Sequence, residues 1–248
     1  MKITYNDQTI DFFEFNPLPE KIILSLSGGL DSASICYLLH LYFPSIEIIP
    51  FCGRDVNAPL DHIAVKKIIN WMKEEFPNSN LKELVSFDFD DRDESFYPAC
   101  RNEIAKNPKF SKLDECQVSK ILQLDKITKE LFTMHPGLIK CDGMTANPPV
   151  KVMKTNENFY KRAERRRDPV SYNIPQMQRN RYSPYINVDK KFVADIYKKH
   201  NLMDSLYPLC RSCTGREDVT NNYTEECHRC FWCYEKKWAF DLNWNKDE

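Results

Sequence analysis

The sequence has 248 residues, of which 42% are hydrophobic, which is enough for an α/β domain with a small satellite and excludes a disordered chain. Acidic and basic residues balance to a formal net charge of −1, which excludes a global field that would draw the chain onto nucleic acid or a membrane. The sequence contains no uncharged apolar run long enough to span a bilayer, and its first residues do not have the pattern of a signal peptide. We therefore expect a soluble, cytoplasmic protein.

The first residues of the chain predict a hairpin. Residues 2–15 alternate polar and apolar side chains on both sides of Asn6-Asp7, a pair that suits a tight turn. We expect this hairpin to edge a sheet, and we take residues 1–20 as an N-terminal segment.

Residues 21–200 have the pattern of an α/β domain, because short apolar runs alternate with stretches whose apolar residues recur at helical spacing. The predicted strands are 21–26, 45–51, 83–89 and 137–142, and the predicted helices are 31–42, 61–76 and 190–200, while residues from about 95 to 131 look largely helical. The second helix should bury Ile63, Val65, Ile68, Ile69 and Met72. Strands separated by such helices run parallel, so we predict an α/β fold with a doubly wound parallel sheet and a small cysteine-rich tail at 201–248.

The motif Ser27-Gly28-Gly29-Leu30-Asp31-Ser32 lies between the first strand of this domain and its helix. The glycines allow a tight turn that presents backbone N–H groups to phosphate oxygens, the helix N-terminus adds a positive dipole, and the serines offer hydroxyls. The spacing matches neither the GxxxxGKS/T loop of kinases and GTPases nor GxGxxG. A Ser/Gly turn that only starts a helix is the alternative. The full motif after a buried strand favours a phosphate-binding loop.

The ten cysteines fall into two groups. Five are scattered through ordinary sequence and indicate core residues or reduced thiols, namely Cys36, Cys52, Cys100, Cys116 and Cys141. The other five lie between residues 210 and 233, and four of them, Cys213, Cys227, Cys230 and Cys233, have the spacing Cys-x13-Cys-x2-Cys-x2-Cys. This spacing predicts a closed, structural Zn²⁺ site. An iron–sulfur cluster takes the same ligands, and Cys210 is a fifth candidate because it precedes Cys213 at a Cys-x2-Cys spacing.

The glycine motif resembles the SGG-x-DS loop of the PP-loop ATP pyrophosphatases, which bind the pyrophosphate end of ATP while a substrate oxygen attacks the α-phosphate. The resemblance implies an adenine nucleotide alpha hydrolase-like fold, with ATP and Mg²⁺ as cofactors. It implies nucleotide contacts from Ser25, Leu26, Ser27, Gly28, Gly29, Leu30, Asp31 and Ser32, and from Gly143 and Asn147 in the loop after the fourth strand. Asp31 and Ser32 would be catalytic, with Asp31 helping to hold Mg²⁺.

The tail resembles the zinc knuckle of the 7-cyano-7-deazaguanine (preQ0) synthases, a PP-loop branch. The residues that carry this resemblance are Ser212-Cys213, Cys227-His228-Arg229-Cys230-Phe231-Trp232-Cys233, and Ala239-Phe240. Asp189-Lys190-x-x-Val193 is similar to a Thr-Lys-x-x-Ile/Val segment of that family, which implies that Lys190 is catalytic and neutralises phosphate charge, with Lys191 as the other register. The chain departs from the family at Lys236, where the family has Arg, at Gly53-Arg54-Asp55 and in a long loop before Cys227.

The resemblance implies an ATP-dependent C–N ligase. The carboxylate of 7-carboxy-7-deazaguanine would attack ATP to give an acyl-adenylate, ammonia would form the amide, and a second ATP would dehydrate it to the nitrile, with release of AMP and pyrophosphate. Lys2 stands where a glutaminase would need a cysteine, so ammonia would be free or delivered by a partner, and a homodimer is compatible with the pattern. Two alternatives remain open. One is a divergent, virus-encoded or defence-associated PP-loop enzyme that adenylates another carboxylate or a base in tRNA or DNA, and the other is a nucleotide-binding module without catalysis.

Residues 151–185 form a basic insert that is foreign to the family pattern and has no clear periodicity. Its centre contains Arg162, Arg165, Arg166 and Arg167, and its aromatic neighbours are Phe159, Tyr172, Tyr182 and Tyr185. Basic residues interleaved with aromatics can pair with phosphates and stack on bases, so nucleic-acid binding is one interpretation. A solvated loop and a lid that closes over ATP phosphates are the others, and we favour the lid over the nucleic-acid surface.

Overall fold

The computed structural model describes most of the chain. The described residues are 1–56, 59–90, 93–107, 114–134, 136–146, 148, 177–178, 180–215, 217–222 and 224–243. Asn147 and the four arginines of the basic insert therefore lie outside the described residues.

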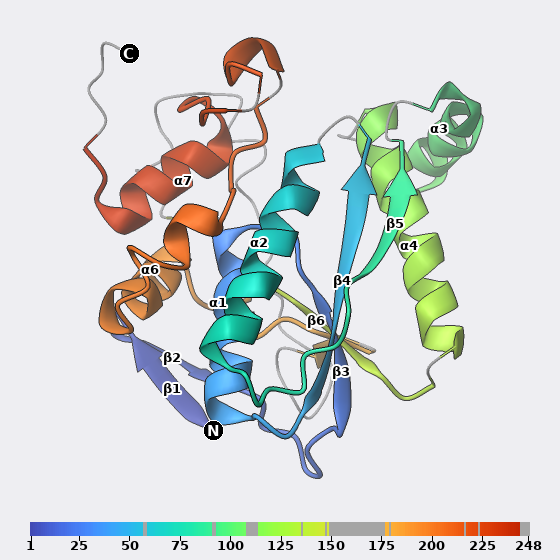
Figure 1. Ribbon diagram of the computed structural model, residues 1–248. Helices are drawn as coiled ribbons and strands as arrows, with labels where there is room; N and C mark the ends of the chain where they lie inside the picture. Colours follow the sequence, from blue (N-terminus) through green and yellow to red (C-terminus); the bar gives the residue numbers. More distant parts are fainter. Residues whose placement is uncertain are drawn as a thin grey trace.

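A six-stranded sheet forms the centre of the molecule (Figure 1). Its strand order is β5-β4-β3-β6-β8-β7, and every neighbouring pair is parallel except β7 with β8. The strands are β3 (Lys21–Ser25), β4 (Glu47–Asp55), β5 (Val85–Phe89), β6 (Ile139–Asp142), β7 (Met177–Gln178) and β8 (Arg181–Tyr182). The predicted parallel α/β fold is therefore confirmed.

Helices cover both faces of the sheet. The helices α1 (Leu30–Tyr42) and α2 (Pro59–Glu75) share a core with one face, and in Figure 1 α2 lies in front of α1 and beside β4. The other face packs through Ile23 and Phe51 against Leu131 of α4 (Glu115–Met134), which follows α3 (Tyr97–Lys106) and a 3₁₀ turn at Glu94–Phe96. The helix α4 lies on the face opposite to α1 and α2 because of the strand order. The chain moves across the sheet in one direction from β3 to β5 and in the reverse direction from β5 to β6, and right-handed connections then place their helices on opposite faces.

The inward residues of α2 were predicted correctly except for one. Val65, Ile68, Ile69 and Met72 are buried, but Ile63 is 44% exposed and does not belong to the core. Residue 63 lies on the solvent side of a helix whose buried stripe passes through the other four positions.

The N-terminal hairpin does not edge the main sheet. The strands β1 (Lys2–Tyr5) and β2 (Gln8–Asp11) pair only with each other, in an antiparallel sheet of two strands. Tyr5 packs edge-on against Phe192 of α6 (Lys190–Lys199), and Gln8 exchanges two hydrogen bonds with Asp189, the residue that caps α6. The hairpin thus covers and anchors a helix instead of extending the sheet.

Two features of the basic insert differ from the prediction. Its end contains β7 and β8, although the sequence shows no strand periodicity there. Tyr182 and Tyr185 are fully buried in the core, so neither forms part of a stacking surface for bases. Burial of both rings agrees with their hydroxyl contacts, since Tyr182 hydrogen-bonds the backbone of Phe13 and Tyr185 lies 3.1 Å from the Ser34 hydroxyl.

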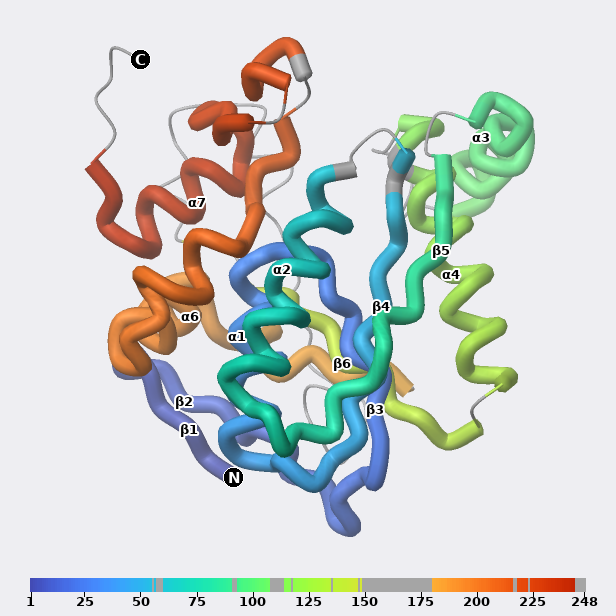
Figure 2. The backbone as a smooth tube through the Cα atoms, in the orientation of Figure 1, coloured from blue at the N-terminus to red at the C-terminus, as the bar shows by residue number. Residues whose placement is uncertain are grey.

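The tail lies at the end of the molecule toward which β4 and β5 point, on the side of α6 and away from α3 (Figure 1). It contains 3₁₀ turns at Tyr207–Leu209 and Glu217–Val219 and the helix α7 (Phe231–Phe240), which packs against α6. Figure 2 shows the N-terminus near the opposite end, beside the hairpin. Among the described residues, no helix is long and apolar enough to cross a membrane.

Candidate functional site

The glycine motif lies where the order of the strands reverses. The chain passes from β3 to β4 and β5 on one side and then returns to place β6 on the other side of β3. Ser25 at the end of β3 pairs in register with Asp142 at the end of β6. A crevice outside the carboxyl ends of two such strands is where open α/β sheets bind ligands. The segments that leave β3 and β6 there are Ser27–Ser32 and the loop that begins at Gly143.

Backbone geometry explains the first glycine of the motif. Gly28 has φ +79°, a left-handed conformation that side chains rarely adopt, and an added Cβ would lie 2.8 Å from the carbonyl oxygen of Asp61 at the start of α2. The turn folds the two serines over each other, with 3.3 Å between the hydroxyl oxygens of Ser27 and Ser32. The backbone N–H of Ser27 also donates to the Ser32 hydroxyl at 3.2 Å. These contacts form a compact loop with both hydroxyls on one side.

The N-terminus of α1 lies in the glycine motif. Its N-cap residue is Gly29, which has no side chain with which to cap the helix. The first N–H groups of a helix lack partners within the helix, and together with the helix dipole they favour a phosphate oxygen. The loop after β6 approaches this end so closely that a Cβ on Gly143 would lie 2.6 Å from the backbone nitrogen of Ser32. Glycine at 143 therefore brings the two loops of the crevice together.

Asp31 and Lys190 form a buried ion pair beside this loop. The ammonium of Lys190, at the start of α6, donates to both carboxylate oxygens of Asp31 at 2.6 Å each. Asp31 is 8% exposed and Lys190 is 3% exposed, so the pair is shielded from bulk water. Lys191 points elsewhere, toward Asp241 at 3.5 Å and the ring of Trp238. Of the two registers considered for this lysine, only Lys190 contacts the motif among the described residues.

A second carboxylate faces Lys190, and the sequence analysis missed it. Glu235 of α7 places one oxygen 3.6 Å from the Lys190 ammonium and has no exposed surface. Its position carries a signal, because Phe231 and Ala239 lie four residues before and after it and are buried. A charged residue in line with apolar residues at helical spacing indicates a buried charge.

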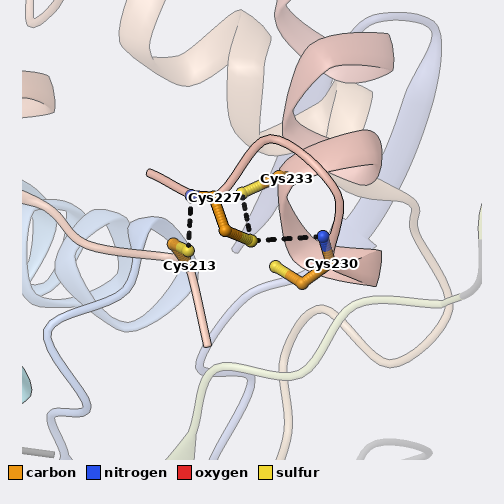
Figure 3. A group of neighbouring side chains, drawn as sticks. All are labelled: Cys213, Cys227, Cys230 and Cys233. Carbon is orange, nitrogen blue, oxygen red and sulfur yellow. Dashed lines mark hydrogen bonds between the residues drawn. The ribbon is translucent and has the colours of Figure 1, made fainter. Parts of the chain in front are cut away.

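The four predicted cysteines converge into one cluster (Figure 3). Cys213, Cys227, Cys230 and Cys233 each offer a sulfur, and these sulfurs all lie within 4.8 Å of one another. Backbone N–H groups surround them, since Cys213 Sγ accepts from Cys227 at 3.2 Å and Cys227 Sγ accepts from Cys230 at 3.3 Å. Hydrogen bonds with the thiols of Cys213 and Cys233 lower the pKa of Cys230. This donor set fits a metal centre.

Cys210 lies outside this cluster. Its thiol donates to the carbonyl oxygen of Leu206 at 3.3 Å and lies 3.3 Å from the Tyr197 hydroxyl, and burial raises its pKa to about 12. The five scattered cysteines are also free thiols, and all but Cys116 are buried. The prediction that they are core residues or reduced thiols is confirmed.

The cysteine tail is joined directly to the glycine loop. The backbone N–H of Arg211 donates to the carbonyl oxygen of Gly28 at 2.7 Å, and its guanidinium lies 3.8 Å from the Asp61 carboxylate. Arg211 comes two residues before Cys213. The first cysteine of the cluster is therefore held close to the turn of the glycine motif, a contact that no sequence pattern indicated.

The remaining predicted nucleotide contacts, and the residues at which the chain departs from the family pattern, differ in burial and in partners. Leu26 and Leu30 are buried, and their backbones bond to other elements, with the N–H of Leu26 donating to Phe51 and the carbonyl oxygen of Leu30 accepting from Tyr197. Ser25 is half-buried. Arg54, in the segment that departs from the family pattern, pairs with Asp88 across the β4 and β5 edge. Lys236, the other departure, donates to Glu226 at 2.8 Å.

The fold and site define a doubly wound α/β protein with a serine- and glycine-rich loop at its switch point and a four-cysteine cluster attached to that loop. No protein-family model matches the sequence, and no curated protein sequence matches it. Among solved structures, the fold is similar to that of the U34-tRNA thiolase NcsA from Methanococcus maripaludis with its 4Fe-4S cluster. The TM-score is 0.44 at 17% sequence identity, and the match covers 73% of this chain and 57% of that chain. This chain thus matches little more than half the length of NcsA.

Proposed function

We propose that this protein is an ATP-dependent adenylating enzyme of the PP-loop type. The observation that carries the proposal is the joint placement of the Ser27–Ser32 loop, the N-terminus of α1 with its glycine N-cap and the Asp31–Lys190 pair at the switch point of the sheet. In the proposed reaction an acceptor oxygen attacks the α-phosphate of ATP. The bond from the α-phosphorus to the bridging oxygen breaks, and pyrophosphate leaves.

Each residue of the site then has a defined role. The backbone N–H groups of the loop and the hydroxyls of Ser27 and Ser32 bind the β- and γ-phosphates, where negative charge builds up as pyrophosphate departs. Lys190 compensates phosphate charge as a compact ammonium donor. Asp31 has the carboxylate oxygens that Mg²⁺ prefers, and the ion would neutralise further charge on the leaving group.

We propose that the cysteine centre binds one zinc ion in a structural role. Tetrahedral zinc with bonds of about 2.3 Å separates its sulfur ligands by about 3.8 Å, and the sulfur separations of up to 4.8 Å are near this value. An iron–sulfur cluster is less compatible, because its thiolates bind different irons and so lie further apart. Four thiolate ligands leave no open position for a substrate, which supports a structural ion.

For the acceptor we propose the carboxylate of 7-carboxy-7-deazaguanine, with ammonia as the second substrate and 7-cyano-7-deazaguanine as the product. The support is the sequence resemblance at the Ser27–Ser32 loop, at Lys190 and in the cysteine tail. Attack by the carboxylate gives an acyl-adenylate, and ammonia displaces AMP to give the amide. A second ATP then activates the amide oxygen, which leaves with AMP as the nitrile forms.

A base in tRNA or DNA is the alternative acceptor. The basic sequence between residues 161 and 167 favours it, because clustered arginines neutralise backbone phosphates. The experiment that decides between the acceptors measures pyrophosphate release from ATP in the presence of 7-carboxy-7-deazaguanine plus ammonium, of tRNA, or of DNA. The acceptor that stimulates release by the wild type, and not by an Asp31→Asn control, is the substrate. If no acceptor and no ATP binding are found in folded, metal-loaded protein, the adenylation proposal is wrong.

A further inference from the structure

Three buried charges from three helices meet beside the glycine loop. Lys190 of α6 has its ammonium 2.6 Å from both oxygens of Asp31 in α1 and 3.6 Å from Oε2 of Glu235 in α7. Their exposed fractions are 3%, 8% and 0%. Two carboxylates therefore share one ammonium in a region shielded from water.

This arrangement has a physical consequence for the proposed reaction. An ammonium buried without a counter-charge is strongly unfavourable, so an Asp31 that alone balanced Lys190 would be held by it and unavailable to other ligands. With Glu235 in contact, Lys190 keeps a counter-charge when Asp31 turns toward a cation. Glu235 thus makes the Asp31 carboxylate available.

The cysteine centre determines where Glu235 lies. The helix α7 begins directly after Cys230, contains Cys233, and reaches Glu235 two residues later. Glu235 projects from the buried face of α7 between Phe231 and Ala239. A metal that fixes the first turn of α7 therefore also fixes this carboxylate beside Lys190.

We infer that Glu235 is a positioning residue that shares Lys190 with Asp31 and holds Lys190 when Asp31 binds the magnesium ion of bound ATP. Through this contact, Glu235 couples the order of the cysteine centre to the glycine loop. This inference rests on the proposed function for its ATP step. The sharing of Lys190 is independent of that function and is tested without nucleotide.

The first test is a double-mutant cycle on the unfolding of the metal-loaded, full-length protein. Asp31→Asn and Glu235→Gln each leave Lys190 one carboxylate, whereas the double variant leaves it none. We expect the double variant to lose more stability than the sum of the single variants, and additive losses would overturn the shared lysine. If the double variant does not fold, adding Lys190→Met removes the uncompensated charge and should restore folding. Failure to restore it would also overturn the inference.

The second test measures binding of magnesium and ATP together by titration calorimetry, with metal content and melting temperature determined on the same samples. Glu235→Gln should keep its metal and weaken binding by about tenfold, the effect of one charge-assisted contact, and Glu235→Asp should recover most of it. Glu226→Gln is the matched control, since it removes a carboxylate from a different lysine of the same tail and should leave binding within about twofold.

The outcomes separate the two ideas. A wild type that binds no ATP with magnesium contradicts the proposed function, while the stability cycle still decides whether Lys190 is shared. Equal binding by the wild type and by metal-loaded Glu235→Gln contradicts the positioning role. Glu235→Gln could instead lose its metal, melt at a lower temperature and bind more weakly, with no recovery in Glu235→Asp. That result would assign Glu235 a purely structural role and overturn the inference.

Discussion

Replacing Gly143 with alanine tests whether the loop after β6 forms one wall of the proposed ATP site. The new Cβ would lie 2.6 Å from the backbone nitrogen of Ser32 and 2.9 Å from its Cα, whereas ordinary contact begins at 3.4 Å. Both obstacles are backbone atoms, which cannot rotate away, so one loop must shift by about 0.8 Å. Overpacking of this kind costs about 1–3 kcal/mol of stability. A displacement near 1 Å in a catalytic site costs up to about 100-fold in rate.

We therefore expect Gly143→Ala to fold with reduced stability in urea and to release pyrophosphate from ATP about 10- to 100-fold more slowly. Gly137→Ala is the control, because residue 137 precedes the same strand at its other end. Gly137 has φ +82° and no atom within 4 Å of an added Cβ, so this variant is strained by about 1–2 kcal/mol without touching the crevice. If the two variants are similarly stable and only Gly143→Ala loses activity, the result supports the assignment of the loop after β6 to the wall of the site. Normal release by a folded Gly143→Ala variant would show that the loop after β6 does not bound the site.

Three further predictions concern the loop, the cysteine centre and the basic insert. Asp31→Asn or Ser32→Ala should lower pyrophosphate release by at least about 100-fold in folded protein through lost charge stabilisation, and near-normal release would refute their catalytic role. The wild type should contain one metal ion per chain, which Cys230→Ser should lose with destabilisation of the tail, whereas Cys210→Ser should retain it; metal retained in Cys230→Ser would show that the ligand set is wrong. Neutralising the three arginines at 165–167 should raise the KM for ATP by less than about tenfold if they close over phosphates. Salt-sensitive binding of tRNA or DNA that these changes abolish, with ATP kinetics unaltered, would instead favour the nucleic-acid acceptor.

Local patterns were sufficient to predict the α/β domain. The strand predicted at 21–26 and the helix predicted at 31–42 have bounds that differ from those of β3 and α1 by no more than one residue. Both elements are strongly apolar, and glycines separate them. The cysteine cluster was predictable for a similar reason, since three of its four ligands lie within seven residues and their spacing is itself the signal.

Features that depend on tertiary contacts were not predictable from local patterns. The hairpin at 2–11 alternates as a sheet-edge hairpin would, and only its packing on α6 shows that it forms a separate sheet. The strands β7 and β8 have two residues each, too short for any periodicity to be recognised. Glu235 was missed because a charged residue next to cysteines is ordinarily solvent-exposed, and its partner Lys190 is distant in sequence.

The two sequence motifs, separated by most of the chain, act on one another at two points. The backbone N–H of Arg211 joins the tail to the carbonyl oxygen of Gly28, the residue with a left-handed conformation in the turn of the glycine loop. Glu235 joins the tail to Asp31 through Lys190, and this contact sets the charge available at the same loop. The first contact concerns the geometry of the glycine loop and the second its charge, and both come from the segment that contains the cysteines. Under the proposed function, a metal in the tail with no open position would therefore act on ATP chemistry without touching the nucleotide.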